Sequence, residues 1–231
     1  MLLEPRYVVL TAKNGEEGLL EAQQNIPDLI ISDVFMPVMD GLECCTRLKQ
    51  DEITSHIPVL LLTAYALDDQ RIEGYKRGAD DYMTKPFNSE VLLARIKNLL
   101  LSRRHIDTGK ENTQEQMAQA EFSTVDTSFV THLQEYITAN MGNADLSIND
   151  LCGEMNMSRV QLYRKCKSLT NVSPVELVRN IRLKQAKHLL QTSPQSVSEI
   201  AYEVGFSSPS YFAKCYRDQY GVSPTEVRNK E

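Results

Sequence analysis

The chain has 231 residues, of which 42% are hydrophobic and 24% charged, with a net charge of −6. This ordinary globular composition argues against a disordered chain, and the length predicts one or two domains. None of the five cysteines lies in a CxxC spacing, which disfavours a disulfide framework and a zinc ribbon and favours a reducing cytoplasm. The longest apolar stretches, such as Pro58–Leu62, are far shorter than the ~18 residues that span a membrane, so we expect no membrane contact in this segment.

Short apolar runs alternate with amphipathic stretches over residues 1–101. The runs predict strands at Tyr7–Leu10, Asp28–Ser32, Pro58–Thr63 and Asp81–Met83. The stretches between them have helical spacing at about 15–25, 41–51, 68–77 and 88–101. This alternation is typical of an α/β fold, in which helices cover both faces of a parallel sheet.

Residues 102–124 contain few large apolar residues and no sustained period, so we predict a linker between two domains. Residues 125–231 form the second domain and are predicted to be almost wholly helical. Ser158 and Ser207 are predicted N-caps, and Pro174 and Pro224 are predicted first-turn prolines. This domain also repeats itself at an offset of 49 to 50 residues, which indicates two copies of one helical unit.

Three polar side chains follow the predicted strands of the first domain. Asp33 and Thr63 each end an apolar run, and Lys85 lies just after a third. Because the carboxyl ends of parallel strands meet at one edge of a sheet, these residues are expected to converge there. A carboxylate, a hydroxyl and a cation around one point suit covalent capture of a phosphoryl group. Taken singly, each could also be an ordinary turn cap or a surface cation.

The stretch around these residues resembles the receiver domain of two-component response regulators. The matching residues are Asp33 with Met36–Gly41, Thr63-Ala64, Gly78–Tyr82 and Lys85-Pro86-Phe87. The resemblance implies that Asp33 is the phosphoacceptor, Thr63 the switch hydroxyl and Lys85 its charge partner. It also implies that Tyr82 is an aromatic residue that swings inward on activation, and that Lys85-Pro86 is a cis peptide.

The sequence departs from the receiver pattern at its start. A complete receiver binds Mg²⁺ through an acidic pair after its first strand, and neither that strand nor that pair is present before Tyr7. Asp33 and, by resemblance, the carbonyl of Phe35 are the remaining ligands, which makes a poor site for octahedral Mg²⁺. The fold expected is therefore a truncated, flavodoxin-like receiver without its first strand, in a chain that is a fragment or begins at an internal Met.

An enzyme is the alternative for this edge of the sheet. Phosphatases of the haloacid dehalogenase type also place Asp, Thr or Ser, and Lys at strand ends. They need a second Asp two residues after the nucleophile, where this chain has Phe35, and a later acidic pair. Asp80-Asp81 precedes Lys85, in the wrong order for that role, so we expect no enzyme.

The second domain has the pattern of two helix-turn-helix units. The first consists of Ser147–Glu154, a turn at Met155–Met157, and Ser158–Ser168; the second consists of Ser196–Val204, a turn at Gly205-Phe206, and Ser207–Gln219. A basic cluster overlaps the first unit, with only Glu176 as an acid among residues 158–187. Its bases are Arg159, Arg164, Lys165, Lys167, Arg179, Arg182, Lys184 and Lys187. Such a cluster predicts a local anion-binding surface.

Residues 130–229 resemble the DNA-binding domain of the AraC/XylS family. The matching segments are Leu162–Lys167, Val172–Leu190 and Ile200–Pro224. The resemblance implies that the two recognition helices read bases in successive major grooves through six residues: Val160, Tyr163 and Arg164, and Ser210, Ala213 and Lys214. It also implies phosphate contacts from Lys167, Arg179, Arg182, Ser207, Ser208 and Arg217.

Together these features predict a cytoplasmic two-component transcription regulator. Phosphorylation of Asp33 by a histidine kinase, which could belong to the same full-length polypeptide, would regulate sequence-specific binding to double-stranded DNA and promote homodimerisation. The alternative is a constitutive DNA-binding protein whose receiver remnant serves only as a dimerisation module.

Overall fold

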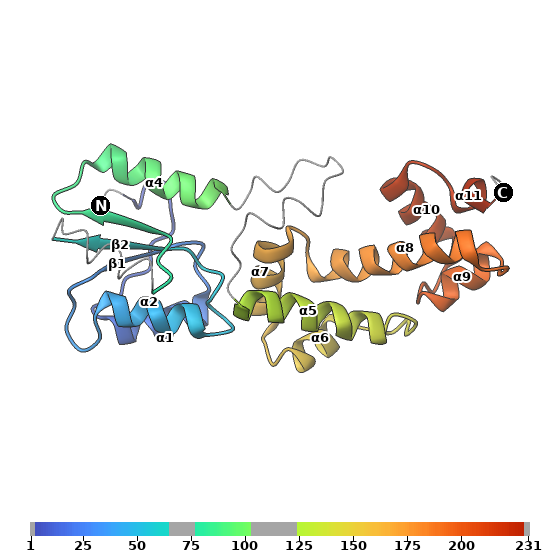
Figure 1. Cartoon of the computed structure of the whole chain (residues 1–231), viewed down its shortest axis with the longest axis horizontal. Helices are drawn as coiled ribbons and strands as arrows, with labels where there is room; N and C mark the ends of the chain where they lie inside the picture. Colours follow the sequence, from blue (N-terminus) through green and yellow to red (C-terminus); the bar gives the residue numbers. More distant parts are fainter. Residues whose placement is uncertain (1–2, 65–76, 103–123, 229–231) are drawn as a thin grey trace. The chain divides into compact units, whose positions relative to one another are not determined.

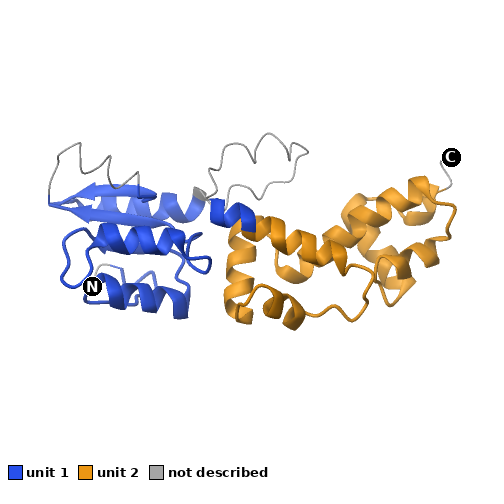
Figure 2. Ribbon diagram, turned by 60° about the horizontal axis from the view of Figure 1, so that its bottom comes forward, with its two compact units in different colours: residues 1–128 blue, residues 129–231 orange. Residues whose placement is uncertain are grey.

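The computed structural model describes residues 3–64, 77–102 and 124–228 (Figure 1). The chain divides into two compact units, residues 1–128 and 129–231 (Figure 2). The boundaries predicted from the sequence, at residues 101 and 125, stay predictions. Nothing among the described helices is both apolar and long enough to span a bilayer.

The first unit contains a parallel three-stranded sheet. Its strands β1 (Ile30–Asp33), β2 (Val59–Thr63) and β3 (Asp81–Thr84) lie in the order β1-β2-β3. The sheet is accompanied by helices α1 (Gly15–Asn25), α2 (Gly41–Gln50) and α4 (Ser89–Ser102). In the register, Asp33 pairs with Leu62 and Thr63 pairs with Thr84, so the strands end at the same level.

Helices cover both faces of this sheet. Val59 and Leu61 of β2 join a core with residues of α1 and α2, including Ala22 and Leu48. Leu60 of β2 points the other way and packs in a second core with Leu92 and Ile96 of α4. Successive residues of a strand face opposite sides, so a strand buried on both faces is apolar throughout. The predicted α/β fold is therefore confirmed.

The strand predicted at Tyr7–Leu10 is wrong. Over the described residues the sheet consists of β1, β2 and β3, and none of these pairs with Tyr7–Leu10. A strand needs a neighbour to accept and donate its backbone hydrogen bonds. Without one, Val8 is 96% exposed, although Tyr7 still packs against the core beneath α4. All but the last residue of the helix predicted at 68–77 falls in residues 65–76, outside the described ranges, as does most of the predicted linker.

The remaining elements are all helices. They are α5 (Thr124–Ala139), α6 (Ile148–Glu154), α7 (Arg159–Thr170), α8 (Pro174–Thr192), α9 (Val197–Glu203), α10 (Pro209–Tyr220) and α11 (Pro224–Arg228). Five of them begin with a capping box, in which a serine and an acidic or amide side chain three residues later satisfy each other's backbone N–H groups. The pairs are Ser147–Asp150, Ser158–Gln161, Ser173–Glu176, Ser196–Glu199 and Ser223–Glu226.

The predicted helix-turn-helix repeat is confirmed. Helix pairs α6–α7 and α9–α10 each pack against each other, and α8 contacts both α7 and α9. The two turns also match: Asn156 and Gly205, at equivalent positions of the repeat, both have a left-handed backbone, with φ of 50° and 86°. At Gly205 a Cβ would lie 2.1 Å from the carbonyl oxygen of Met141, so this turn requires glycine.

One predicted cap is displaced by a residue. Ser208, rather than Ser207, caps α10, and its hydroxyl accepts a hydrogen bond from the Tyr211 N–H at 3.3 Å. Pro209 occupies the first turn of α10. A proline at the first helical position makes the preceding residue the cap, because its own fixed φ is already helical.

Two glycines are predicted to respond oppositely to alanine. At Gly41 a Cβ would lie 2.1 Å from the carbonyl oxygen of Asp33, so Gly41→Ala should destabilise the first unit by about 1–3 kcal/mol. At Gly153, in α6, nothing lies within 4 Å of a Cβ. Gly153→Ala should therefore stabilise the second unit by about 0.5–1 kcal/mol, through the lower helix propensity of glycine. Urea unfolding followed by circular dichroism measures both, and a neutral Gly41→Ala would contradict the close packing.

Candidate functional site

The carboxyl edge of the sheet brings an acid and a cation together. Asp33 ends β1, and Lys85 follows β3 in a cis Lys85-Pro86 peptide. The Lys85 Nζ forms an ion pair with the Asp33 Oδ2, and the two side chains are 37% and 36% exposed. The carboxylate is thus reachable from solvent and is already next to a positive charge. The predicted convergence of Asp33 and Lys85, and the predicted cis peptide, are confirmed.

Thr63 and Tyr82 lie buried behind this pair. Thr63 is fully buried at the end of β2, and its carbonyl accepts a hydrogen bond from the Lys85 N–H at 2.6 Å. Tyr82, in β3, is 4% exposed and therefore already faces the interior, so its expected swing inward on activation stays a prediction. Burial raises the pKa of the Tyr82 phenol, and the neighbouring Thr63 hydroxyl opposes the shift. Thr63 thus neighbours both Lys85, through its carbonyl, and Tyr82, through its hydroxyl.

Hydrogen bonds and one left-handed residue fix the conformation of the loop after Asp33. Gly41 N–H donates to the carbonyl of Val34 at 2.9 Å, and Asp40 caps α2 by accepting from the Glu43 N–H at 2.7 Å. Val38 has a left-handed backbone, with φ of 67°. The loop therefore turns tightly and leaves Phe35 54% exposed beside Asp33. These features explain why a short Met-Pro-x-Met-Asp-Gly segment follows the carboxylate.

A magnesium ion does not fit the residues that the structure describes here. Among those residues, no group of three His, Cys, Asp or Glu side chains is placed to hold a metal. Asp33 is the carboxylate at the carboxyl edge, and Mg²⁺ needs six oxygens in near-octahedral geometry. The Mg²⁺ expected for a complete receiver stays a prediction.

The acidic pair that an enzyme of the haloacid dehalogenase type would need lies elsewhere. The Asp80 Oδ2 accepts hydrogen bonds from the Lys49 Nζ at 2.8 Å and from the Val59 N–H at 2.7 Å. Asp81 begins β3 and forms an ion pair with Arg95 at 2.5 Å. Both are at the amino end of the strand, four and five residues before Lys85, which corresponds to about 13–17 Å along an extended chain. Asp80 therefore connects to α2 and β2, and Asp81 connects to α4, instead of serving Asp33.

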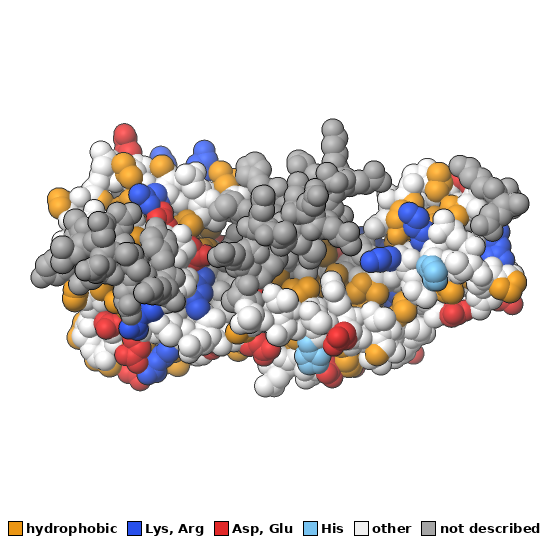
Figure 3. Space-filling model, viewed as in Figure 1, with side chains coloured by type: hydrophobic (Ala, Val, Ile, Leu, Met, Phe, Trp, Pro, Cys, Tyr) orange, Lys and Arg blue, Asp and Glu red, His pale blue; other side chains and the backbone are white. Residues whose placement is uncertain are grey.

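The outward face of α7 carries the residues predicted to read bases. Val160 and Tyr163 are 56% and 53% exposed, and Arg164 is also exposed. Leu162 and Cys166, on the opposite side of the helix, are fully buried. In α10, Ser210 and Lys214 are exposed and Ala213 is half-buried. Lys and Arg side chains lie among hydrophobic ones on the part of the second unit that carries α8 and α10 (Figure 3).

The residues predicted to contact phosphates differ in their surroundings. Lys167 and Arg217 are exposed near the ends of their helices, and Arg179 is half-buried. The Arg182 guanidinium donates to the carbonyls of Met141 and Asn143 at 3.1 and 2.6 Å, and burial lowers its pKa. Arg182 and Ser208 thus already make hydrogen bonds within the fold, and the Lys167 Nζ donates to the Asn171 carbonyl at the end of α7.

One base of the predicted basic cluster points inward. Lys165 is fully buried, with its Nζ 4.7 Å from the centre of the Phe129 ring. Its position in the repeat corresponds to the buried Cys215 of α10. Lys165 therefore adds nothing to the outward anion-binding surface, and its assignment to that surface is wrong.

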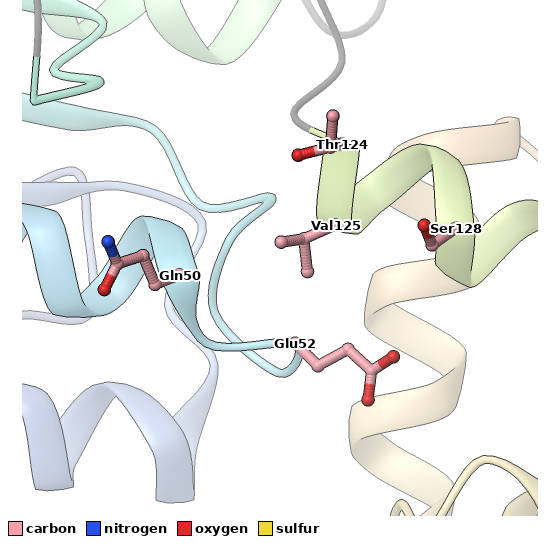
Figure 4. A pocket seen from close by; sticks show the side chains of 5 residues that line it. All are labelled: Gln50, Glu52, Thr124, Val125 and Ser128. Carbon is pink, nitrogen blue, oxygen red and sulfur yellow. The ribbon is translucent and has the colours of Figure 1, made fainter.

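A shallow pocket within the first unit contains none of the predicted residues. It is lined by Gln50, Glu52, Thr124, Val125 and Ser128 (Figure 4). The side chains include one acid and no base, so the pocket offers no counterpart to the phosphoryl or DNA chemistry.

Comparison with known families matches both parts of the chain. Residues 1–97 match the response regulator receiver domain and residues 151–230 match a helix-turn-helix domain. A histidine kinase of Formosa agariphila is 39% identical over 99% of this chain and 17% of its own length. The transcriptional regulator RpaA of Synechocystis is 48% identical over 41% of this chain and 39% of its own length. The chain thus spans well under half the length of these relatives.

Solved structures match each part separately. A putative response regulator from Chloroflexus aurantiacus is 40% identical, covers 43% of this chain and 82% of its own, and has a TM-score of 0.41. A transcriptional regulator with an AraC-type DNA-binding domain, from Chromobacterium violaceum, is 29% identical, covers 47% of this chain and 96% of its own, and has a TM-score of 0.43.

The family matches agree with the ion-paired aspartate at the sheet edge and with the repeated helix pairs. The chain therefore combines a response regulator receiver domain, matched over residues 1–97, with a helix-turn-helix domain, matched over residues 151–230.

Proposed function

We propose that the chain is a transcription regulator in which phosphorylation of Asp33 controls the binding of both helix-turn-helix units to DNA. The observation that carries the proposal is the solvent-accessible Asp33 carboxylate, held beside Lys85 at the carboxyl edge of the sheet. A nucleophilic carboxylate beside a fixed cation is the arrangement that phosphoryl capture needs.

The proposed reaction is a transfer to an oxygen of Asp33. That oxygen attacks the phosphorus of a phosphohistidine, the P–N bond breaks, and the electron pair leaves with the imidazole. The product is an acyl phosphate on Asp33. Lys85, already paired with the carboxylate, is placed to neutralise the phosphoryl oxygens. The donor is a histidine kinase, and similarity over nearly the whole chain to part of a longer histidine kinase supports a donor in the same polypeptide.

The proposed switch is the packing of Thr63 and Tyr82. A phosphoryl group on Asp33 attracts the Thr63 hydroxyl, and the buried Tyr82 beside it must then repack. A local change of charge of this kind shifts the equilibrium between two packing arrangements, here those of Thr63 and Tyr82. Homodimerisation through the face that follows Thr63 would transmit the change; that face begins in residues 65–76, outside the described ranges.

The proposed DNA contacts use the outward faces of α7 and α10. A helix fits the major groove, and guanidinium and ammonium groups pair with guanine acceptors there. The base-reading residues proposed are Val160, Tyr163, Arg164, Ser210, Ala213 and Lys214. The phosphate contacts proposed are Lys167, Arg179, Arg182, Ser207, Ser208 and Arg217, with Arg182 and Ser208 keeping their structural bonds.

Asp33→Asn should abolish phosphoryl control without abolishing DNA binding. The amide cannot form an acyl phosphate but has the same size, so the fold should be kept. The full chain is incubated for an extended time with acetyl phosphate and Mg²⁺. Because Mg²⁺ does not fit the described residues, we expect labelling to be slow, and intact-protein mass should finally show one phosphoryl group that is absent in the variant. DNA affinity, measured by gel shift, should change with the donor only in the unsubstituted chain. Labelling without any change in affinity would instead support the constitutive regulator, and no labelling would contradict the phosphoacceptor.

Two arginines should separate base reading from phosphate binding. Arg164→Ala should weaken binding to the selected site by about 1–3 kcal/mol and relax the preference at one base position. Arg179→Ala should weaken binding to all sequences alike and lower the salt dependence. Competition gel shifts against unrelated DNA measure both. An unchanged ratio of specific to non-specific binding in Arg164→Ala would show that Arg164 reads no base.

A further inference from the structure

The outward face of α7 carries apolar side chains that are not part of the hydrophobic core. Val160 and Tyr163 are 56% and 53% exposed, and they are separated by three residues, so they lie side by side on one face. Arg164 is four residues after Val160 and shares that face. The core of this unit is served by the opposite side of the helix, where Leu162 and Cys166 are fully buried.

At the positions equivalent to Val160, Tyr163 and Arg164, α10 keeps the charge but not the apolar groups, although its Tyr211, at the position of Gln161, is 54% exposed. The N-caps Ser158 and Ser208 align the two helices. At the positions of Val160, Tyr163 and Arg164, α10 has Ser210, Ala213 and Lys214. The cation is preserved, whereas an isopropyl group becomes a hydroxymethyl group and a phenol ring becomes a methyl group. At these equivalent positions, α7 therefore presents apolar and aromatic groups beside its cation, whereas α10 presents a hydroxyl and a methyl group.

Only one base presents a hydrocarbon group in the major groove, namely thymine with its C5-methyl. An exposed valine and tyrosine on a helix in that groove match this group, while an adjacent arginine matches the O6 and N7 acceptors of guanine. Resting on the proposed function, we infer that α7 reads thymine methyl groups through Val160 and Tyr163, next to a guanine read by Arg164. At the equivalent positions of α10, only the methyl of Ala213 is available for such contacts.

Replacing thymine by uracil in the DNA tests this directly, because it removes the methyl group and leaves base pairing unchanged. Sites are first selected from random duplexes with the full chain. The half of the motif that faces α7 is the half whose preference relaxes in Arg164→Ala. Uracil at a thymine of that half should weaken binding about fourfold per methyl group, and uracil in the other half should have a smaller effect.

Four variants assign the effect to its side chains. In Val160→Ser and Tyr163→Ser the ratio of affinities for thymine and uracil DNA should fall towards one. The matched controls are Val175→Ser in α8 and Tyr202→Ser in α9, since these side chains are 59% and 57% exposed but lie outside both recognition helices. In the controls the ratio should stay at its original value. Circular dichroism confirms that each variant is folded.

The outcomes distinguish this inference from the function on which it rests. If selection recovers no enriched motif, the proposed function itself fails. If a motif is enriched but the half that faces α7 contains no thymine, or uracil there leaves the affinity unchanged, thymine reading by α7 is wrong while DNA recognition stands. Equal loss of the ratio in the control variants would also overturn the assignment to Val160 and Tyr163.

Discussion

One continuous helix determines how the two helix-turn-helix pairs of the second unit are placed relative to each other. Helix α8 has 19 residues, which corresponds to about 28 Å. Pro174 and the box formed by Ser173 and Glu176 start it. Its later residues, such as Leu183 and Leu190, are part of the core formed with α9 and α10, and it also contacts α7. Both helix-turn-helix pairs are packed on α8, so the length of α8 sets the distance and the rotation between α7 and α10. Adding one residue to α8 would rotate one pair by about 100° relative to the other.

The same dependence on backbone geometry applies to the receiver domain. Asp33, Thr63 and Lys85 are far apart in sequence, but the parallel register ends their strands at one level. Hydrophobic alternation was sufficient to predict the strands β1, β2 and β3, and strand ends in a parallel sheet predict where their polar residues meet. The ion pair between Asp33 and Lys85 was therefore accessible from the sequence. The strand expected at Tyr7–Leu10 was wrong, because an apolar run can be read from the local sequence whereas a strand also needs a neighbouring strand to pair with.

Other features depend on neighbours that periodicity does not reveal. Lys165 was grouped with surface bases because its charge is visible in the sequence, but its position in the repeat corresponds to Cys215, which is buried; aligning the two units at their N-caps would have signalled this. Arg182 bonds to carbonyls about 40 residues away in the chain, and no spacing rule predicts such a contact. The cap at Ser208 could have been predicted from Pro209, which follows it directly.

The central claim is that two recognition helices, spaced by α8, contact successive major grooves on one side of a duplex. Hydroxyl-radical footprinting of the full chain on its selected site tests this most directly. The account predicts two protected segments whose centres lie about 10 base pairs apart, which places them on the same side of the DNA. A single protected segment, or two segments separated by a half-integral number of helical turns, would contradict it.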